Sequence, residues 1–369
     1  MNNVSLYIHI PFCARKCLFC SFAVAVAQIH RQQDYVNALI NEMVSYEGQK
    51  ICSVYFGGGT PSTLGINELA RLMSEVRARF TLNDGCEITL EANPEDFTEE
   101  KLSAFYRAGI NRLSIGVQSF DDRYLRFLGR AHDSRKAKNA FAVAAAVGIK
   151  NISGDLMYGF PGQTALELES DIDQMVEQGC THISIYTLTI EPNSRFHAQA
   201  VKLDDEQKLA DHYQLIIDRL RAHGFDQYEV SNFAKKGYES KHNSHYWLGH
   251  EYVGLGMGAH GYWQGRRYWN HDRLNVYLDA ISAGQSAVAG SELLSEETKL
   301  KERLIFGLRM NQGVSEHEIF HGAPKELLNT LYREINLLIE AGLLIRHQDR
   351  LSVTDQGRMV LDEIAIKLV

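Results

Sequence analysis

The chain has 369 residues, of which 45% are hydrophobic and 23% charged, and it carries a formal net charge of -8. This composition is typical of a folded globular protein, and the acidic balance without a long lysine and arginine run argues against disorder and against a nucleic-acid partner. No apolar stretch reaches the length of a bilayer span and the first residues lack the basic region of a signal peptide, so we expect a cytoplasmic protein.

Strand-like runs alternate with helical segments along the first half of the chain. The runs lie near residues 5–10, 51–56, 87–91, 112–117, 151–157 and 183–188. Between the first two runs, Val36, Leu39, Ile40 and Met43 share one helical face, as in a helix that covers one side of a sheet. Such alternation, about every 30 residues, predicts βαβ units with a parallel sheet, either closed into a barrel or open and doubly wound.

Several helix boundaries are marked by their local sequence. Gly109, Gly148, Gly179 and Gly224 each precede a strand-like run, where glycine can adopt the left-handed conformation that ends a helix. The segment 164–167 has the pattern of a capping box and predicts a helix that begins there and ends near residue 178.

Three of the six cysteines, Cys13, Cys17 and Cys20, are crowded just after the first strand-like run. Thiolates are the preferred ligands of iron-sulfur clusters, and three cysteines for four irons leave one iron open to another ligand. A Cys3His zinc site completed by His9 or His30 is the alternative. The remaining cysteines are scattered, as expected for small buried hydrophobes.

Polar and glycine-rich motifs follow the later strands. Gly57, Gly58 and Gly59 precede Thr60 at the end of the second run, where they expose backbone that a ligand can approach closely. Residues 91–94, 116–120 and 155–162 end the third, fourth and fifth runs. Because a barrel gathers its functional loops at the carboxyl ends of its strands, these motifs favour a partial TIM-like (βα)6 barrel over an open sheet.

The C-terminal part of the chain has a different texture. From about residue 295, helices are followed by two short strands and a last helix, which predicts a smaller, mostly helical, winged-helix-like domain. It lacks a densely basic recognition helix, so we expect it to have a packing role. We therefore expect a barrel over 1–230, a barrel-associated extension over 231–294 and the C-terminal domain over 295–369.

Together these motifs, from about Val4 to Trp269, resemble the radical S-adenosylmethionine family that contains heme chaperones of the HemW branch and oxygen-independent coproporphyrinogen III oxidases. The resemblance implies a [4Fe-4S] cluster on the three cysteines, with S-adenosylmethionine bound to the open iron. It further implies two groups of cofactor contacts. Those to a first S-adenosylmethionine are Tyr7, Phe19, Gly58 and Glu91, and those around a second are Gly59, Thr60, Gln118, Arg130 and Asp155.

Other features of the same resemblance separate the chaperone branch from the oxidases. Oxidases have a cysteine two residues after the third ligand, where this chain has Phe22, and they carry a long extension before the cluster motif, which begins here at residue 13. Residues 242–247 match the HNxxYW motif of the chaperones, although Ser21 stands where many chaperones have aspartate. The match implies heme binding at His242, with His245 or His260 as alternative ligands; without it, the segment would be interpreted as a packing loop.

Three hypotheses follow from the sequence. The first is a heme chaperone that delivers heme to a membrane respiratory protein, with transient membrane association, an electron donor for the cluster and a homodimer as further expectations. The second is an oxygen-independent coproporphyrinogen III oxidase, which would need a basic pocket for the propionates of its substrate. The third is a metal-stabilised barrel of unrelated activity.

Overall fold

Most strands belong to one sheet in the computed structural model, which describes residues 3–369. This 12-stranded sheet has the order β14-β13-β12-β11-β1-β4-β5-β6-β7-β8-β10-β9. Its central strands are mutually parallel. They are β1 (Val4–Ile10), β4 (Lys50–Gly58), β5 (Thr81–Ala92), β6 (Arg112–Gln118), β7 (Asn151–Tyr158) and β8 (His182–Thr187). The predicted six-unit parallel barrel is therefore confirmed.

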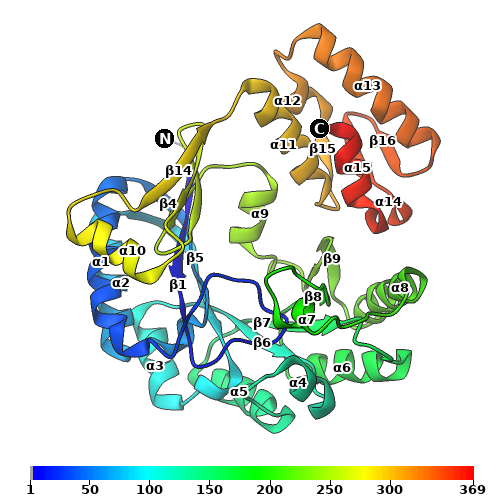
Figure 1. Ribbon diagram of the computed structural model, residues 1–369. Helices are drawn as coiled ribbons and strands as arrows, with labels where there is room; N and C mark the ends of the chain where they lie inside the picture. Colours follow the sequence, from blue (N-terminus) through cyan, green and yellow to red (C-terminus); the bar gives the residue numbers. More distant parts are fainter. Residues whose placement is uncertain (1–2) are drawn as a thin grey trace.

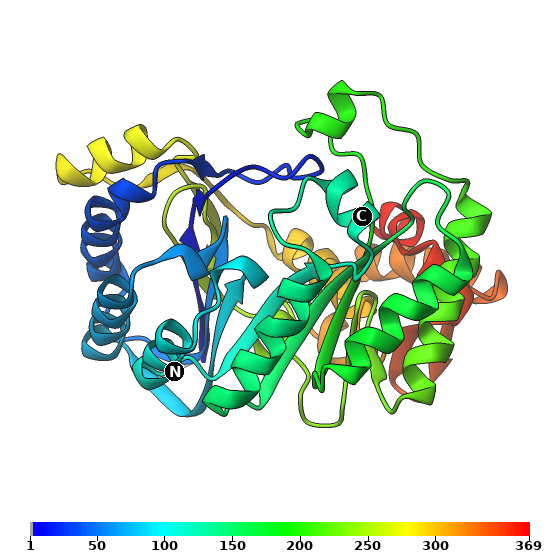
Figure 2. The ribbon, with the colours of Figure 1, turned by 90° about the horizontal axis from the view of Figure 1, so that it is seen from below.

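Helices cover the outer, convex side of these strands (Figures 1 and 2). They are α1 (Gln32–Met43), α2 (Ile66–Arg79), α3 (Glu99–Ala108), α5 (Ser134–Val147), α6 (Ala165–Glu177) and α8 (Glu206–Ala222), while the short α4 (Asp122–Leu128) and α7 (Arg195–Ala198) lie in strand-to-helix connections. The predicted capping box at Thr164 and Glu167 is present, and Gly109 and Gly148 end their helices with positive φ. The local signals therefore placed these helix boundaries correctly.

Side chains alternate along the central strands between the helices and the barrel interior. In β1, Leu6 and Ile8 are fully buried in the hydrophobic core under the helices. Ser5, one residue before Leu6, instead forms a hydrogen bond of 2.8 Å with Ser53 of β4. Because side chains of a strand alternate between its two faces, the outer face is apolar and the inner face is polar.

The segment after β8 extends both ends of the sheet. On the β8 side, β10 (Asn232–Ala234) pairs antiparallel with β8, and β9 (Asp226–Glu229) pairs antiparallel with β10. On the β1 side, β11 (Tyr252–Leu255) is parallel to β1 and is followed by antiparallel β12 (His260–Trp263), β13 (Arg266–Asn270) and β14 (Val288–Leu293). Since β9 and β14 end the strand order, the barrel stays open.

Helix α9 (Lys241–Trp247) lies on the inner side of the sheet, between the strands and the C-terminal domain (Figure 1). It contacts β4 on one side and α11 (Glu296–Leu308) on the other. Helix α10 (Leu274–Ser282) contacts α1 on the outer side. The residues predicted as a barrel-associated extension therefore close part of the barrel interior.

The C-terminal elements enclose a hydrophobic core of their own. After α11 come β15 (Val314–Ser315), α12 (Glu316–Phe320), α13 (Lys325–Glu340), β16 (Leu344–His347), β17 (Arg350–Val353), α14 (Asp355–Met359) and α15 (Leu361–Leu368). The three strands form one small antiparallel sheet beside the helices, in agreement with the predicted winged-helix-like domain. The limits 1–230, 231–294 and 295–369 stay predictions. No helix within residues 3–369 has the length and apolar character that a membrane span requires.

A buried carboxylate joins α1 to the added strands. Glu42 accepts hydrogen bonds from the backbone N–H of Gly256, the hydroxyl of Tyr277 and the side-chain amide of Asn270, at 2.8, 2.7 and 2.6 Å. Burial raises the pKa of Glu42 to about 7, and these three donors oppose that rise. Glu42 therefore ties the first helix to residues more than two hundred positions later in the chain.

Replacing Glu42 with alanine should lower the free energy of unfolding by about 3 kcal/mol, because three buried donors lose their acceptor. Chemical denaturation followed by circular dichroism measures this change. Asn41→Ala, at an exposed position of the same helix, is the matched control and should have little effect. Equal stability of the two variants would contradict the assigned role of Glu42.

Candidate functional site

The predicted cysteine ligands lie on one loop across the carboxyl end of the barrel. A short parallel pair, β2 (Phe12–Cys13) with β3 (Ala25–Val26), holds the two ends of the loop together. In the middle, the backbone N–H of Leu18 donates to Leu128, and its carbonyl accepts from Phe196. The loop, dark blue in Figure 2, is thus fixed by the protein itself.

A cavity of about 490 Å³ lies beneath this loop, inside the barrel. It brings together most of the residues predicted from the sequence. Cys13, Cys17, Phe19, Cys20, Gly58, Gly59, Thr60, Glu91, Gln118, Arg130 and Asp155 all line it. Tyr7 and His242 do not line the cavity and instead lie behind Tyr55, which contacts both of their rings.

Polar side chains contact the sulfur atoms of the loop. The Thr60 hydroxyl lies 3.3 Å from Cys13 Sγ, and an Arg130 guanidinium nitrogen donates to Cys17 Sγ at 3.4 Å. Asn93 joins these two contacts, because its amide donates to Thr60 and accepts from Arg130. Burial raises the pKa of the Cys13 thiol to about 11, while the Thr60 contact and the Arg130 charge favour the thiolate. These two contacts partly offset the effect of burial and would stabilise the thiolate forms that bind iron.

His9 does not complete a Cys3His zinc site. One ring nitrogen of His9 bonds to the Tyr7 hydroxyl and the other to the Ala23 carbonyl, each at 3.1 Å. Within residues 3–369 no three histidine, cysteine, aspartate or glutamate side chains converge as ligands of a single metal ion. All three loop cysteines are free thiols on the cavity wall. This donor set fits an iron-sulfur cluster better than one zinc ion.

The glycine motif brings the end of β4 against the cysteine loop. A Cβ on Gly59 would lie 2.6 Å from the backbone of Pro11, and a side chain on Gly58, whose φ is +112°, would collide with the His9 ring. The Gly58 N–H instead donates to Glu91, at 3.2 Å. Only glycine therefore allows this close approach.

Two half-buried carboxyl groups face the cavity. Glu91 accepts from the Tyr55 hydroxyl at 2.7 Å, and Asp155 accepts from Ser114 at 3.0 Å. Burial raises the pKa of Glu91 to about 7, and the nearby charge of Asp155 adds to the rise. Burial also raises the pKa of Asp155. A cationic ligand group would stabilise the charged forms of both, so the cavity is suited to a ligand that carries positive charge.

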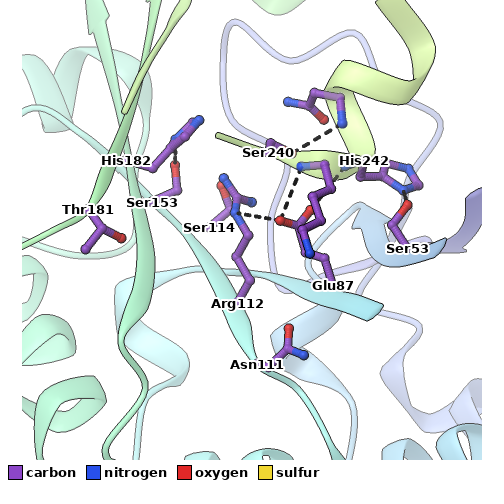
Figure 3. A network of polar contacts seen from close by, with 12 residues as sticks. Ser53, Glu87, Asn111, Arg112, Ser114, Ser153, Thr181, His182, Ser240 and His242 are labelled. Carbon is purple, nitrogen blue, oxygen red and sulfur yellow. Dashed lines mark hydrogen bonds and ion pairs between the residues drawn. The ribbon is translucent and has the colours of Figure 1, made fainter. Parts of the chain in front are cut away.

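The HNxxYW motif forms α9, and buried polar side chains hold this helix inside the barrel (Figure 3). The Glu87 carboxylate accepts from the backbone N–H groups of Lys241 and His242, and the Arg112 guanidinium lies 3.9 Å from it. The Ser240 hydroxyl caps the helix by accepting from the Asn243 N–H. The amino end of α9 is therefore bound to β5 by one carboxylate.

His242 is 1% exposed, and both of its ring nitrogens are occupied. Nδ1 lies 2.9 Å from the Ser53 hydroxyl and Nε2 lies 2.7 Å from the Tyr246 hydroxyl, while the ring stacks on Tyr55. Burial lowers the pKa of His242 to about 3, so the imidazole is neutral. Heme ligation by His242 stays a prediction, and it requires that one of these hydrogen bonds breaks.

Several residues of the site were not predicted. Tyr55 and Asn93 stand inside the recognised motifs without an assigned role, and Arg112 begins a strand-like run. Arg112, Ser114, Gly116 and Gln118 follow one another at every second position of β6, and all line the cavity. Polar residues at alternate positions of a strand could have indicated this inner face.

Known proteins share both the sequence and the fold. Residues 7–175 match the Radical SAM superfamily, and residues 294–360 match the HemN C-terminal domain. The chain is thus a radical SAM protein in its barrel and HemN-like in its last domain. It is 36% identical over 369 residues to the heme chaperone HemW of Bacillus subtilis, covering 98% of this chain and 97% of that protein. It is also 41% identical over 263 residues to HemW of Escherichia coli, 70% of each chain. The chain belongs to the HemW family of heme chaperones.

A solved structure of Escherichia coli HemN, described as a coproporphyrinogen III oxidase and a radical SAM enzyme, shares the fold. It aligns with a TM-score of 0.87, covering 99% of this chain and 90% of that chain, at 24% sequence identity. At this identity the likeness shows the common architecture alone.

His242→Ala should lower the free energy of unfolding by about 2 kcal/mol, because the Ser53 and Tyr246 hydroxyls each lose one hydrogen-bond partner and a cavity opens beside Tyr55. Thermal and urea unfolding measure the loss. His260→Ala, at an exposed position of β12, should leave stability unchanged. If both substitutions had the same small effect, the buried role of His242 would be wrong.

Proposed function

We propose that the protein is a heme chaperone that carries a [4Fe-4S] cluster on Cys13, Cys17 and Cys20 and binds S-adenosylmethionine beside it. The observation that carries this proposal is that the three free thiols and most of the predicted cofactor contacts line one cavity. Membership of the HemW family supports the heme function. Delivery of heme to a membrane respiratory protein, an electron donor, a homodimer and transient membrane contact belong to the same proposal.

The roles of the cavity residues follow from their contacts. When bound, the cluster and S-adenosylmethionine supply electron transfer and radical chemistry that the protein's side chains cannot perform. Arg130 and Thr60 stabilise the thiolates of Cys17 and Cys13 by donating to sulfur. Glu91 is positioned to accept from an ammonium or ribose group, and its hydrogen bonds from Tyr55 and Gly58 hold it in place.

The second group of predicted contacts lies around the inner carboxylate. Asp155 can pair with a cationic group and is oriented by Ser114. Arg130 is held by the Gly116 carbonyl and by Asn93, which leaves its charge close to the cavity. A second S-adenosylmethionine beside Gly59, Thr60 and Gln118 remains part of the proposal.

An oxygen-independent coproporphyrinogen III oxidase is the alternative function. Phe22, which stands where oxidases have a further cysteine, is 65% exposed beside the cluster loop and offers no ligand. Arg15 and Lys16 line the same mouth and could meet the carboxylates of a tetrapyrrole. These two cations are the feature that favours the alternative, and an activity assay tests it directly.

Cys17→Ser should abolish the cluster while the barrel stays folded, because the Cys17 side chain belongs to none of the hydrophobic clusters within residues 3–369 and the loop is fixed by backbone hydrogen bonds. Iron and sulfide analysis and electron paramagnetic resonance of the anaerobically reduced protein measure the loss. Cys52→Ser, outside the loop, is the control and should keep the signal. A normal [4Fe-4S] signal from Cys17→Ser would exclude the proposed ligand set.

The wild-type protein should bind heme stably and should not convert coproporphyrinogen III under reducing conditions with S-adenosylmethionine present. A heme titration and an anaerobic decarboxylation assay on the same preparation test both statements. The absorption spectrum reports binding, and chromatography of the porphyrin products reports turnover. Robust decarboxylation would establish the oxidase alternative instead.

A further inference from the structure

A buried histidine near the cysteine loop has no part in the site described above. The His132 side chain is 0% exposed. Its Nδ1 lies 3.2 Å from the Glu95 carboxylate, and its Nε2 lies 3.0 Å from the Val117 carbonyl. Burial raises the pKa of Glu95, but the His132 hydrogen bond and the Arg130 charge outweigh it and lower that pKa below its ordinary value. Both partners of the ring are therefore acceptors, so both ring nitrogens donate.

His132 ends a short segment, residues 128–132, whose other end contacts the cysteine loop. The Leu128 carbonyl accepts from the Leu18 N–H at 3.0 Å. Gly129 has a φ of +73°, and an added Cβ there would lie 3.0 Å from Leu18 Cγ. The segment therefore connects the end of β6, where the histidine is anchored, to the middle of the loop that carries the thiols.

Arg130 lies within this segment and points to one of the proposed cluster ligands. One guanidinium nitrogen donates to Cys17 Sγ at 3.4 Å, and the other donates to the Asn93 side chain and the Gly116 carbonyl at 2.6 and 2.8 Å. No carboxylate within residues 3–369 forms an ion pair with Arg130, so direct contact does not neutralise its charge. One hydrogen bond and one positive charge thus act on this sulfur.

The electron that reduces an iron-sulfur cluster makes the cluster and its ligands more negative. Hydrogen bonds to the ligand sulfurs and nearby positive charges stabilise that reduced form, and so they raise the reduction potential. Charges act more strongly in a half-buried site than in water. The position of the Arg130 guanidinium should therefore influence how readily the cluster accepts an electron.

Building on the proposed [4Fe-4S] cluster, we infer that the pair of His132 and Glu95 holds the 128–132 segment so that Arg130 donates to Cys17, and that this contact raises the reduction potential of the cluster. Arg130 contacts the ligand sulfur directly. His132 is a positioning residue that acts through Arg130. Because this role requires no bound S-adenosylmethionine, it can be measured on the protein that holds its cluster alone.

A redox titration of the full chain with its cluster assembled, followed by electron paramagnetic resonance, tests the inference. Arg130→Met and His132→Ala should each lower the equilibrium constant for one-electron reduction roughly tenfold, a shift of about 59 mV to more negative potential. Arg130→Lys keeps the charge without the forked donor and should shift the potential less. Arg126→Met and His197→Ala, at exposed positions of α4 and α7, are matched controls and should leave it unchanged.

A double substitution separates positioning from a direct effect of the histidine. If His132 acts through Arg130, adding His132→Ala to Arg130→Met should cause no further shift. Additive shifts, or an unchanged potential in either single variant, would overturn the inference. If Arg130→Met does not hold its cluster, His132→Ala and Arg130→Lys, which retain a positive side chain at position 130, carry the test. Wild-type protein that assembles no [4Fe-4S] cluster would instead overturn the proposed function.

Discussion

The alternation of side chains on the central strands is the constraint on which the rest of the structure depends. One face of each strand is buried under helices and is apolar, and the other lines an interior that holds serines, tyrosines, carboxylates and Arg112. A polar interior is costly unless its groups find partners. Here most of them find partners in one another, in α9 and, as proposed, in bound cofactors, although Arg112 Nε and Thr89 Oγ1 lack a hydrogen bond within residues 3–369.

The buried pair of Glu87 and Arg112 illustrates how this interior is stabilised. Isolated, either charge would be costly to bury, and the 3.9 Å contact alone compensates incompletely. Glu87 also accepts two backbone N–H groups at the start of α9, where a negative charge interacts favourably with the helix dipole. The carboxylate that balances Arg112 therefore also fixes the helix that carries the histidines.

The sequence predicted those parts of the site that are contiguous in the chain. The cysteine loop, the glycine motif and the polar strand ends could be recognised because each occupies a few consecutive residues, and βαβ topology brings strand ends together. The environment of His242 could not be predicted, because its partner Ser53 is 189 positions away. Nothing local distinguishes His242, which is buried, from His245, which is half-buried on the same helix. The place of Arg112 in the barrel interior could not be predicted either, because Arg112 stands at the start of a largely apolar run and resembles a solvent-exposed strand end.

The pairing of β1 with β11 affects how the chain is made. One side of β1 pairs with β4, but the other pairs with residues 252–255, so it has no partner until that part of the chain emerges from the ribosome. At roughly 5–20 residues per second, the delay is on the order of 12–50 seconds. Throughout that time an apolar strand with an unpaired edge is present in the cell, which is a condition that favours aggregation. Efficient production of this protein should therefore depend on factors that protect nascent chains.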